Sequence, residues 1–384
     1  MRKICIVVTA RPSYARIKSV MSAIKKRSDV KLQLVVAASA LLERYGSAID
    51  YMKTDGFKPD AVVYMVLEGE NLVTAAKSTG LGIVELATVF DNLKPDVVVS
   101  IADRYETIAT AIAAAYSNIP LVHVQGGEVT GSIDEKVRHA VTKLSDLHFV
   151  ANEDAKRRVI KMGEDPDKVF STGCPSIDLA AQISNTSTKN FNPFELIQKG
   201  VGEPFDPKEE YLVVMQHPVT TEYKDSLAQI EQTLMAISSL KMPTFWLWPN
   251  VDAGSDKISK GIRMFRENNH IPFIYFLKNM APEDFLKLLI NSKCLIGNSS
   301  TGIRECSYLG LPVVNIGKRQ QGRLRGKNVI DVDCNKQDII NAIDKQLQNG
   351  KYPKEEVYGD GCADQKIVEL LSTVELSIDK KIHY

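Results

Sequence analysis

The chain has 384 residues, and at ~150 residues per domain this length predicts two or three domains. Apolar residues make up 44% of it, which is sufficient for well-packed cores. Because 48 Lys and Arg residues balance 47 Asp and Glu residues, the net charge gives no general attraction to nucleic acid or to an anionic membrane. The sequence has no run of ~18 consecutive apolar residues, so we predict no membrane-spanning segment.

The cysteines and the first apolar segment indicate a cytoplasmic protein. None of the six cysteines forms a CxxC pair, which is typical of a reduced chain. The apolar residues 4–10 follow Met1-Arg2-Lys3 as in a signal peptide, but Arg11-Pro12 ends them early and no cleavage site follows. We therefore interpret residues 3–8 as the first strand.

Short β-branched runs alternate with helical patterns in the first half of the chain. We predict strands at residues 3–8, 32–37, 61–66, 97–101, 119–124 and 147–150, and helices at 71–92 and 105–116. Near-continuous apolar strands of this kind are typical of a parallel sheet that is covered on both faces.

The pattern pauses at residues 184–210, which are rich in polar residues and predict a linker or surface excursion. Strands are predicted again at 211–215, 244–248, 273–277, 294–296 and 312–316, and a helix at 363–378. The sequence thus predicts an α/β protein of two doubly wound domains, residues 1–176 and 177–362, with a C-terminal helix within 363–384 that packs back on the first domain. Ligands of open α/β sheets bind at the carboxyl ends of the strands, so we expect an active-site cleft between the domains.

Residues 102–140 bring together more polar chemistry than any other segment. A strand ends at its start, a second strand leads into a glycine turn in its middle, and a helix opens near its end. Each acid alone has an ordinary alternative, a surface ion pair or a favourable charge at a helix N-terminus. Together they predict an enzyme site. The candidate residues are Asp103, Arg104, His123, Gln125, Glu128, Asp134, Glu135 and Arg138.

Two further segments follow predicted strands of the second domain. His217 ends the strand at 211–215, in the sequence Gln216-His217-Pro218. Residues 297–305, GNSSTGIRE, have the outer glycine spacing of a P-loop but lack its Lys-Ser/Thr pair, which disfavours an ATPase. Their hydroxyls and N–H groups suit a diphosphate, and Glu305 suits a ribose diol; the alternative is a helix capping box.

Basic residues supply the remaining candidates. Arg11 follows the first strand, where it serves either an anion or only a helix start with Pro12 in its first turn. The loop 317–327 carries five cations, of which one or two suit phosphate neutralisation. The pair Asp331 and Asp333 resembles a metal motif but has no third ligand, and the GxGxxG signature of nicotinamide binding is absent, so we predict neither a metal nor a cofactor.

Several blocks of the sequence, in this order, resemble the UDP-N-acetylglucosamine 2-epimerase family: ADRYE, HVQGGEVTGSIDEKVRHAVTKLSDLHF, QHPVTT, WPNVDAGS, GNSSTGIRE and GKRQQGR. The resemblance spans nearly the whole chain and is strongest to the hydrolysing branch, which feeds sialic-acid-type pathways. It implies two Rossmann-like domains as in the glycosyltransferase-B fold, no metal and no nicotinamide, and a homodimer or homotetramer. It also implies loss of the C2 proton and of UDP to give a glycal, followed by hydration to N-acetylmannosamine.

The resemblance assigns roles to residues of this chain. UDP is expected mainly on the second domain, with Glu305 at the ribose, and the sugar is expected at the acids of the first. The predicted catalytic residues are Asp103, Glu128, Asp134, Arg138 and His217. The predicted substrate-binding residues are Arg11, His123, Gln125, Asn250, Ser299, Ser300, Gly302, Glu305 and Arg319.

Three residues depart from the family pattern. Ala102 stands where a glycine is usual, and Ser13 where an aspartate is frequent. Gln125 replaces a glutamate that many relatives have as a proton-transfer group, and an amide cannot act as a base. Either Glu128 takes that role or Gln125 only hydrogen-bonds the sugar.

Three functions are compatible with these observations. The first and leading one is a hydrolysing UDP-N-acetylglucosamine 2-epimerase. Its alternative is a hydrolysing 2-epimerase that acts on a UDP- or GDP-linked diacetamido-trideoxyhexose, a different sugar that is compatible with the Gln125 substitution. The second is a glycosyltransferase of the same architecture, which needs an acceptor site. The third is a sugar-nucleotide sensor, which the density of acids and bases argues against.

Overall fold

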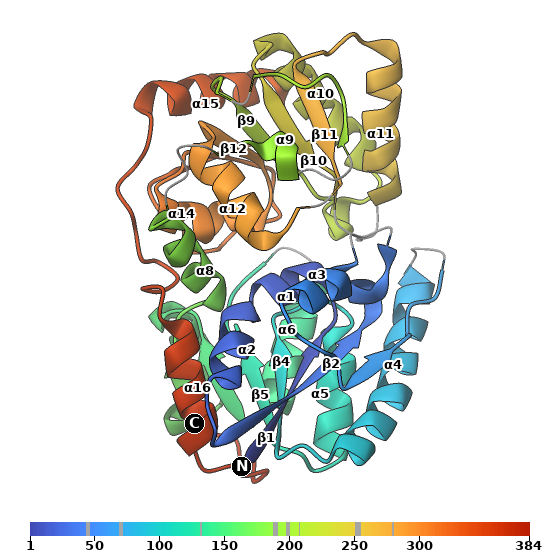
Figure 1. Ribbon diagram of the computed structural model, residues 1–384, viewed down its shortest axis with the longest axis vertical. Helices are drawn as coiled ribbons and strands as arrows, with labels where there is room; N and C mark the ends of the chain where they lie inside the picture. The colour runs from blue at the N-terminus through green and yellow to red at the C-terminus, as the bar shows by residue number, and fades with distance from the viewer. Residues whose placement is uncertain are drawn as a thin grey trace. The chain divides into compact units, whose positions relative to one another are not determined.

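Two seven-stranded sheets organise the chain in a computed structural model (Figure 1). The structure describes residues 1–43, 47–68, 72–130, 133–186, 191–196, 200–206, 208–249, 255–278 and 280–384. The chain divides into two compact units, and each sheet belongs to one of them. Unit 1 contains residues 1–128, 133–179 and 358–384, and unit 2 contains 129–132 and 180–357.

The first sheet is parallel throughout, with strand order β3-β2-β1-β4-β5-β6-β7. Its strands are β1 (Arg2–Val8), β2 (Val30–Ala37), β3 (Ala61–Val63), β4 (Val97–Ile101), β5 (Leu121–Val124), β6 (Leu147–Val150) and β7 (Val169–Ser171). The helices of this half are α1 (Arg11–Ala15), α2 (Lys18–Lys25), α3 (Ala48–Thr54), α4 (Leu72–Leu93), α5 (Thr107–Tyr116), α6 (Ile133–Leu144), α7 (Glu153–Lys161), α8 (Pro175–Ser184) and α16 (Ala363–Thr373).

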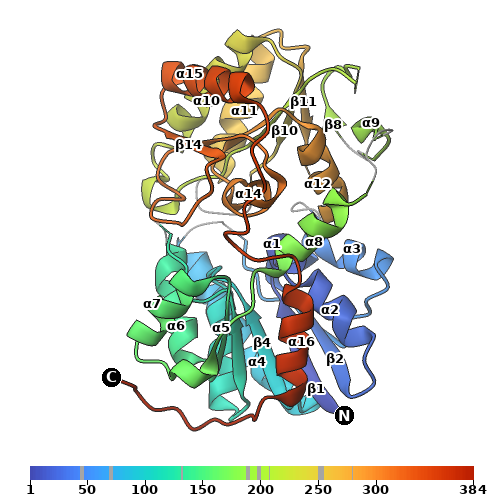
Figure 2. The same ribbon diagram turned by 90° about the vertical axis from the view of Figure 1, so that its left-hand side faces the viewer.

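Helices cover both faces of this sheet because its strands are apolar on both sides. Ile4, Ile6 and Val8 of β1 pack with α2, α3 and α16 in one core. Cys5 and Val7, which alternate with them, pack with α4, α5 and α6 in the other. Figure 2 shows α16 beside α2, on the first of these faces. The buried alternation explains why these strands read as continuous apolar runs.

The second sheet has the order β14-β13-β12-β9-β10-β11-β8 and is parallel except for the edge pair β8 and β11. Its strands are β8 (Gly200–Val201), β9 (Leu212–Met215), β10 (Thr244–Leu247), β11 (Ile274–Leu277), β12 (Cys294–Gly297), β13 (Val313–Ile316) and β14 (Val329–Val332). The helices of this half are α9 (Pro193–Leu196), α10 (Ser226–Leu240), α11 (Ser255–Asn268), α12 (Pro282–Asn291), α13 (Ser300–Ile303), α14 (Glu305–Leu309) and α15 (Lys336–Asn349). Leu212, Trp246 and Phe276 pack with α10, α11 and α15 in its main core.

The predicted α/β class with two doubly wound sheets is confirmed. Strands β7, β8 and β14 were not predicted, because each has only two to four residues or lies at a sheet edge with little burial. The predicted linker 184–210 contains the end of α8, the short α9 and the antiparallel strand β8. The domain boundaries were predicted at residues 176 and 362. In the structure, the chain passes from unit 1 to unit 2 between residues 179 and 180, and it returns between residues 357 and 358.

The C-terminal segment requires a correction, because its helix ends at Thr373 and not near residue 378 or 384. Arg2 Nη1 donates to the carbonyls of Leu371 and Val374 at 2.8 and 2.9 Å, and so satisfies the last turn of α16. Val374 itself is extended. Asp178 caps the other end of α16 by accepting from the amides of Ala363 and Asp364, both at 2.8 Å.

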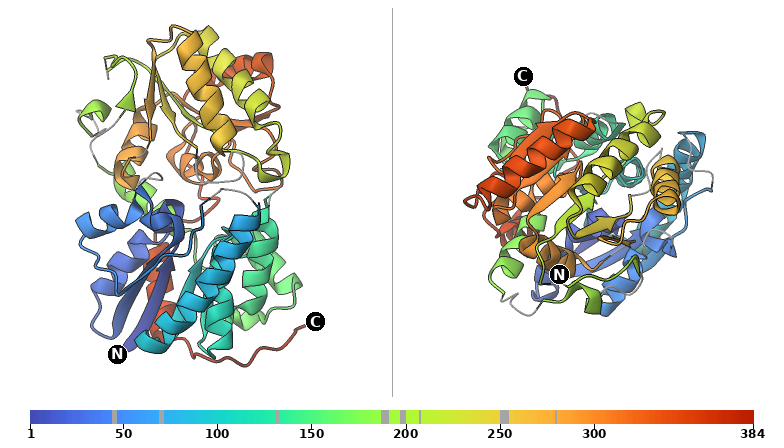
Figure 3. Two further views of the ribbon diagram at one scale, coloured as in Figure 1. Left: turned by 90° about the vertical axis from the view of Figure 1, so that its right-hand side faces the viewer. Right: turned by 90° about the horizontal axis from the view of Figure 1, so that it is seen from above.

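Helix α4 bears on the prediction that the chain has no membrane-spanning segment. By length and composition alone it is long and apolar enough to cross a membrane, although polar residues interrupt its apolar run. Leu86 and Phe90 face the sheet, while Val73 and Val84 are exposed. The left view of Figure 3 shows α4, in light blue, on the outer side of the unit 1 sheet. It is a covering helix of a packed layer with one apolar face uncovered.

Candidate active site

The loop after β4 turns sharply at Ala102. This residue has φ of +62°, in the left-handed region that glycine adopts without strain. Its amide donates to the carbonyl of Val124 at 2.9 Å, which ties the loop to the end of β5. The glycine that is usual at this position in the family is therefore explained by backbone geometry, and alanine here carries a conformational cost.

Asp103 and Arg138 form a buried ion pair at the same edge of the sheet. Arg138 of α6 donates to the Asp103 carboxylate through Nη2, and Arg16 Nη1 lies 3.8 Å from the other carboxylate oxygen. Burial alone would lower the pKa of Arg138, but Asp103, Glu128 and Glu135 outweigh burial and raise it. Arg138 thus places a permanent cation beside the Asp103 carboxylate.

The same guanidinium connects the other predicted acids. Its Nη1 donates to the backbone carbonyl of Glu128 and to the carboxylate of Glu135, both at 2.8 Å. Glu128 is buried at the end of the glycine turn. Asp134 lies in the first turn of α6, one turn before Arg138 on the same helix. Arg138 therefore connects Asp103, Glu128 and Glu135, and Asp134 lies one helical turn away from it.

His123 lies in the interior, where no solvent reaches it. Its Nε2 is 2.8 Å from the carbonyl oxygen of Ala102, and its Nδ1 is 3.1 Å from Thr142 Oγ1 of α6. Burial lowers the pKa of His123 to about 3, so the ring is neutral at physiological pH. Both ring nitrogens are occupied by protein groups, which favours an internal hydrogen-bonding role over the predicted contact with substrate.

Gln125 is buried in the turn after β5 and has φ of +70°. Its Nε2 donates to Cys174 Sγ at 2.6 Å, and Ser176 Oγ lies 3.0 Å from the same sulfur. The side-chain oxygen of Gln125 is buried without a hydrogen-bond partner in the structure. A backbone held in the left-handed region and an unused acceptor are both typical of functional positions. Gln125 is equipped to accept a hydrogen bond from a ligand.

Arg11 begins α1, directly after β1, and is half-buried. Burial lowers its pKa, and the neighbouring charge of Arg104 lowers it further. Arg104 in turn donates to Glu106 at 2.8 Å. Two guanidinium groups that repel each other at the carboxyl ends of β1 and β4 favour an anionic ligand.

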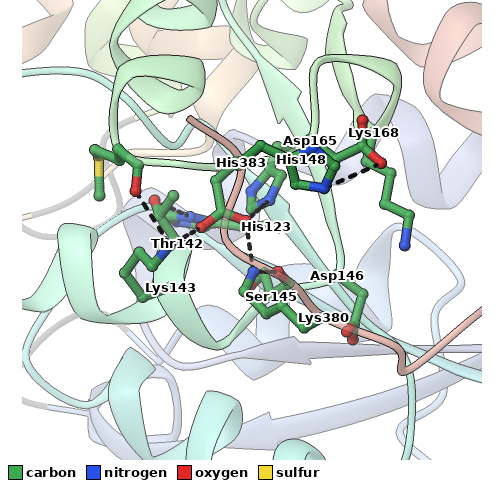
Figure 4. Close-up of polar contacts among 12 residues, drawn as sticks. His123, Thr142, Lys143, Ser145, Asp146, His148, Asp165, Lys168, Lys380 and His383 are labelled. Carbon is green, nitrogen blue, oxygen red and sulfur yellow. Dashed lines mark hydrogen bonds and ion pairs between the residues drawn. The ribbon is translucent and has the colours of Figure 1, made fainter.

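Unit 1 also contains a charged cluster that was not predicted from the sequence (Figure 4). Glu164 is buried and accepts from His148 at 2.9 Å, from Lys143 at 2.6 Å and from Lys380 at 2.5 Å. Burial alone would raise the pKa of Glu164, but these three hydrogen bonds lower it to about 2. Lys380 comes from the segment after α16, so the cluster holds the C-terminal segment on unit 1.

In unit 2 the predicted residues meet around Asn298. The Asn298 side chain accepts from the amide of His217 at 2.7 Å and donates to its carbonyl at 2.8 Å. Gly297 before it has φ of +134°, and a Cβ there would lie 2.1 Å from the carbonyl of Met215. Only glycine permits this close approach of β12 to β9, and it places His217 beside the loop that follows β12.

The small residues of that loop take up the positions expected from the sequence. Ser299 caps α13 and accepts from the amide of Thr301 at 3.3 Å. This is a helix cap without the glutamate of the expected capping box, because the third residue of α13 is Gly302 and Glu305 belongs to α14. Ser300 Oγ is 3.5 Å from Arg304 Nη1, and Arg304 is buried. A Cβ on Gly302 would lie 2.8 Å from Val313, so this glycine serves close packing of α13 on β13.

Glu305 opens α14 and has a buried carboxylate oxygen without a hydrogen-bond partner in the structure. A buried carboxylate oxygen is costly unless a donor satisfies it. A pair of vicinal hydroxyls supplies such donors. The geometry therefore agrees with the predicted contact of Glu305 with a ribose diol.

The basic loop also converges on Asn298. Arg319 Nη1 and Gln320 Nε2 donate to the Asn298 carbonyl at 3.1 and 2.9 Å. Arg325 instead pairs with Asp331, which also accepts from Asn315 at 2.8 Å. Arg319 is thus the cation of this loop that lies at the predicted site. Asn250 lies outside the described residues.

Metal ligation has no candidate group in the part of the chain that the structure describes, where no three His, Cys, Asp or Glu residues are grouped for it. None of the six cysteines, all of which lie among the described residues, forms a disulfide bond. What the arrangement offers is carboxylates held beside guanidinium groups in unit 1, and hydroxyls, a carboxylate and a cation in unit 2. These groups suit proton transfer on a sugar and binding of a nucleoside diphosphate.

Sheet order and site together define an α/β enzyme of two Rossmann-like units with the glycosyltransferase-B-like fold. Residues 22–372 match the family model of the UDP-N-acetylglucosamine 2-epimerases. The chain therefore belongs to the UDP-N-acetylglucosamine 2-epimerase family, as its sequence blocks predicted, and is a sugar-nucleotide 2-epimerase.

Three known proteins illustrate the similarity. The UDP-N,N'-diacetylbacillosamine 2-epimerase (hydrolyzing) of Legionella pneumophila is 34% identical over 376 residues, which cover 98% of this chain and 97% of that protein. The GDP/UDP-N,N'-diacetylbacillosamine 2-epimerase (hydrolyzing) of Campylobacter jejuni is 32% identical over 349 residues, 90% of this chain and 87% of that one. The crystal structure of UDP-GlcNAc 2-epimerase from Neisseria meningitidis has a TM-score of 0.78 at 19% identity, covering 96% of this chain and 99% of that one.

Proposed function

We propose that this protein is a hydrolysing 2-epimerase that releases UDP and a free 2-acetamido sugar with inverted configuration at C2. The observation that carries the proposal is the placement of Asp103 and Glu128 beside the buried Arg138, with Asp134 one helical turn before it, on a chain similar over 98% of its length to a hydrolysing relative. Unit 2 supplies the groups that suit the nucleotide.

The proposed reaction has two proton-transfer steps. A carboxylate of unit 1 first takes the C2 proton while the C1–O bond to the diphosphate breaks, which leaves a C1–C2 double bond. Water then adds its oxygen to C1, and C2 receives a proton on the opposite face. Because C2–H is a weak acid, the leaving diphosphate needs cationic stabilisation, for which Arg319 and Arg11 are the proposed groups.

For the sugar we propose a UDP-linked diacetamido-trideoxyhexose of the N,N'-diacetylbacillosamine type. Two relatives, of 34% and 32% identity, act by their names on this sugar. Gln125, which stands in place of the usual glutamate, offers an unused acceptor that suits an N–H donor such as a second acetamido group. UDP-N-acetylglucosamine, with N-acetylmannosamine as product, remains the second candidate, since the Neisseria meningitidis enzyme shares the fold.

A panel of UDP- and GDP-linked amino sugars tests the proposal by nucleotide release. We expect release of UDP, faster with the diacetamido sugar than with N-acetylglucosamine, and without added metal or NAD. In deuterated water the free sugar should carry deuterium at C2, because the proton lost there returns from solvent. Absence of deuterium at C2 would contradict elimination, and complete loss of activity with a chelator would contradict the metal-free reaction.

Two other functions are separated by the same assay. A glycosyltransferase would release UDP only when an acceptor is added, so release with water alone excludes it. A sugar-nucleotide sensor would bind UDP-sugars without turnover. Protein that binds the whole panel and converts none of it would contradict the proposed enzyme.

We also propose a homo-oligomer, a dimer or tetramer, in the cytoplasm, with the exposed apolar face of α4 as a contact between copies. Exposure of the long apolar face of α4 to water is unfavourable. The same face of a second copy of the chain can cover it, as in a symmetric homo-oligomer. Light scattering should give a dimer or tetramer for the native protein, and Val84→Glu should shift it toward smaller species. Association of native protein with lipid vesicles instead of self-association would contradict this contact.

A further inference from the structure

We propose that His123 is a positioning residue that holds the Asp103 carboxylate in place through the backbone of Ala102, without touching substrate itself. This inference rests on the proposed function, in which Asp103 is a catalytic carboxylate. It replaces the direct substrate contact that the sequence predicted for His123. The geometry that supports it is a closed path of contacts within unit 1.

The path begins and ends at the turn after β4. His123 Nε2 contacts the Ala102 carbonyl at 2.8 Å, and Asp103, the next residue, is bound by Arg138 of α6. Thr142 lies one turn after Arg138 on the same helix, and its hydroxyl returns to His123 Nδ1 at 3.1 Å. The Asp103 loop is therefore held at two consecutive residues, Ala102 by His123 and Asp103 by Arg138. Because α6 anchors both holding groups, a shift of either changes the carboxylate position.

The contacts also determine which tautomer His123 adopts. A backbone carbonyl can only accept a hydrogen bond, so Nε2 carries the proton and donates it to Ala102. Nδ1 is then an acceptor, and the Thr142 hydroxyl donates a hydrogen bond to it. Burial keeps the ring neutral with a pKa of about 3, and the surrounding charges of His148, Arg138 and Asp103 have smaller effects on it. A Cβ on Gly126 would lie 2.9 Å from Nδ1, so this glycine lets the turn close over the ring.

The need for such a residue follows from Ala102. An alanine at φ of +62° is strained relative to glycine, and the turn is therefore inclined to relax toward other conformations. The hydrogen bond from His123 opposes that relaxation at the carbonyl of the strained residue. In this chain, which lacks the usual glycine, accurate placement of Asp103 depends on His123 more than it would with glycine at position 102.

The central experiment compares His123→Leu with His123→Gln, alone and combined with Ala102→Gly. We expect His123→Leu to lower kcat on the order of 10²-fold, the effect of a small misplacement of a catalytic group, while UDP affinity stays unchanged. Gln presents an amide donor near the position of Nε2 and should restore most of kcat. Ala102→Gly should raise the kcat of the Leu variant by roughly tenfold, because glycine adopts the turn without the strain.

Controls separate positioning from general damage to the fold. Thr142→Val should lower kcat and Thr142→Ser should not. Ser145→Ala removes another buried hydroxyl, just after the end of α6, which donates to the Val141 carbonyl, and it should leave kcat unchanged. If all of these variants, Ser145→Ala included, lose kcat to a similar extent and in parallel with a fall in melting temperature, the inference is overturned. It is also overturned if Ala102→Gly does not restore kcat in the His123→Leu variant.

A measurement without turnover distinguishes failure of this inference from failure of the proposed function. Nitrogen-15 NMR of histidine-labelled protein should show His123 as the neutral Nε2–H tautomer from pH 5 to 8. The Nδ1–H tautomer or a charged ring would overturn the inference even if the enzyme is active. Wild-type protein inactive on every sugar of the panel would overturn the proposed function, while the expected tautomer would still support the geometry.

Discussion

Replacing Asp103 by asparagine should lower turnover by ~10²–10⁴-fold, the usual contribution of a general acid or base. Asp103 is buried and bound to Arg138, so an amide fills the same space but carries no charge and takes no proton. UDP affinity should be retained, because Asp103 is not among the proposed contacts of the nucleotide. Initial rates with the preferred sugar, and calorimetric titration with UDP, measure the two effects separately.

Asp146→Asn is a matched control for this variant. Asp146 is partly buried in unit 1 and accepts from the amide of Leu121 at 2.9 Å, at the start of β5 and so at the opposite edge of the sheet. Its turnover should equal that of the wild type. If Asp103→Asn keeps more than a tenth of the activity, Asp103 is not the group that transfers the proton.

Glu128 and Asp134 extend the same test to the other acids around Arg138. At least one of Glu128→Gln and Asp134→Asn should approach inactivity while UDP still binds, and Gln125→Ala should weaken sugar binding but leave measurable chemistry. Gln125→Glu restores the acid common among relatives and should shift the preference between sugars. An inactive Gln125→Ala beside two active acid variants would show that the carboxylates are wrongly assigned.

Loss of UDP affinity is the second large effect, expected for Ser300→Ala and Glu305→Ala. Glu305 has a buried carboxylate oxygen to which no described residue donates a hydrogen bond, and the Ser300 hydroxyl lies beside the buried Arg304. A hydrogen bond that involves a charged group is worth about 1.5–3 kcal/mol, which corresponds to ~10- to 150-fold in dissociation constant. Calorimetric titration with UDP measures it directly.

Ser292→Ala is the control for the nucleotide-binding variants. Ser292 is also buried in unit 2, but its hydroxyl donates to the Leu289 carbonyl at 2.8 Å, before β12 begins. It should bind UDP as the wild type does. Unchanged affinity in both Ser300→Ala and Glu305→Ala would remove the loop after β12 from the site.

The strand pattern shows how much of the fold was encoded locally. The alternating faces of β1 each meet a helical layer, so its side chains from Ile4 to Val8 are all apolar, and the parallel sheet was predictable from composition and length. The candidate acids were also predictable, because residues after parallel strands share one edge of the sheet. The short edge strand β8 was not, because two residues give no periodicity and its antiparallel pairing depends on a partner distant in the chain.

For this protein, the sequence by itself determined the family, the two doubly wound sheets and the polar residues at the strand ends, since these depend on local patterns and residue identity. Only the tertiary structure decided which of those residues have internal partners. His123 is two residues from Gln125 in sequence, yet its ring is closed off by Ala102 and Thr142 while Gln125 keeps an unused acceptor. The reason is physical: whether a side chain is satisfied depends on groups that other strands and helices bring to it, and no local pattern contains them.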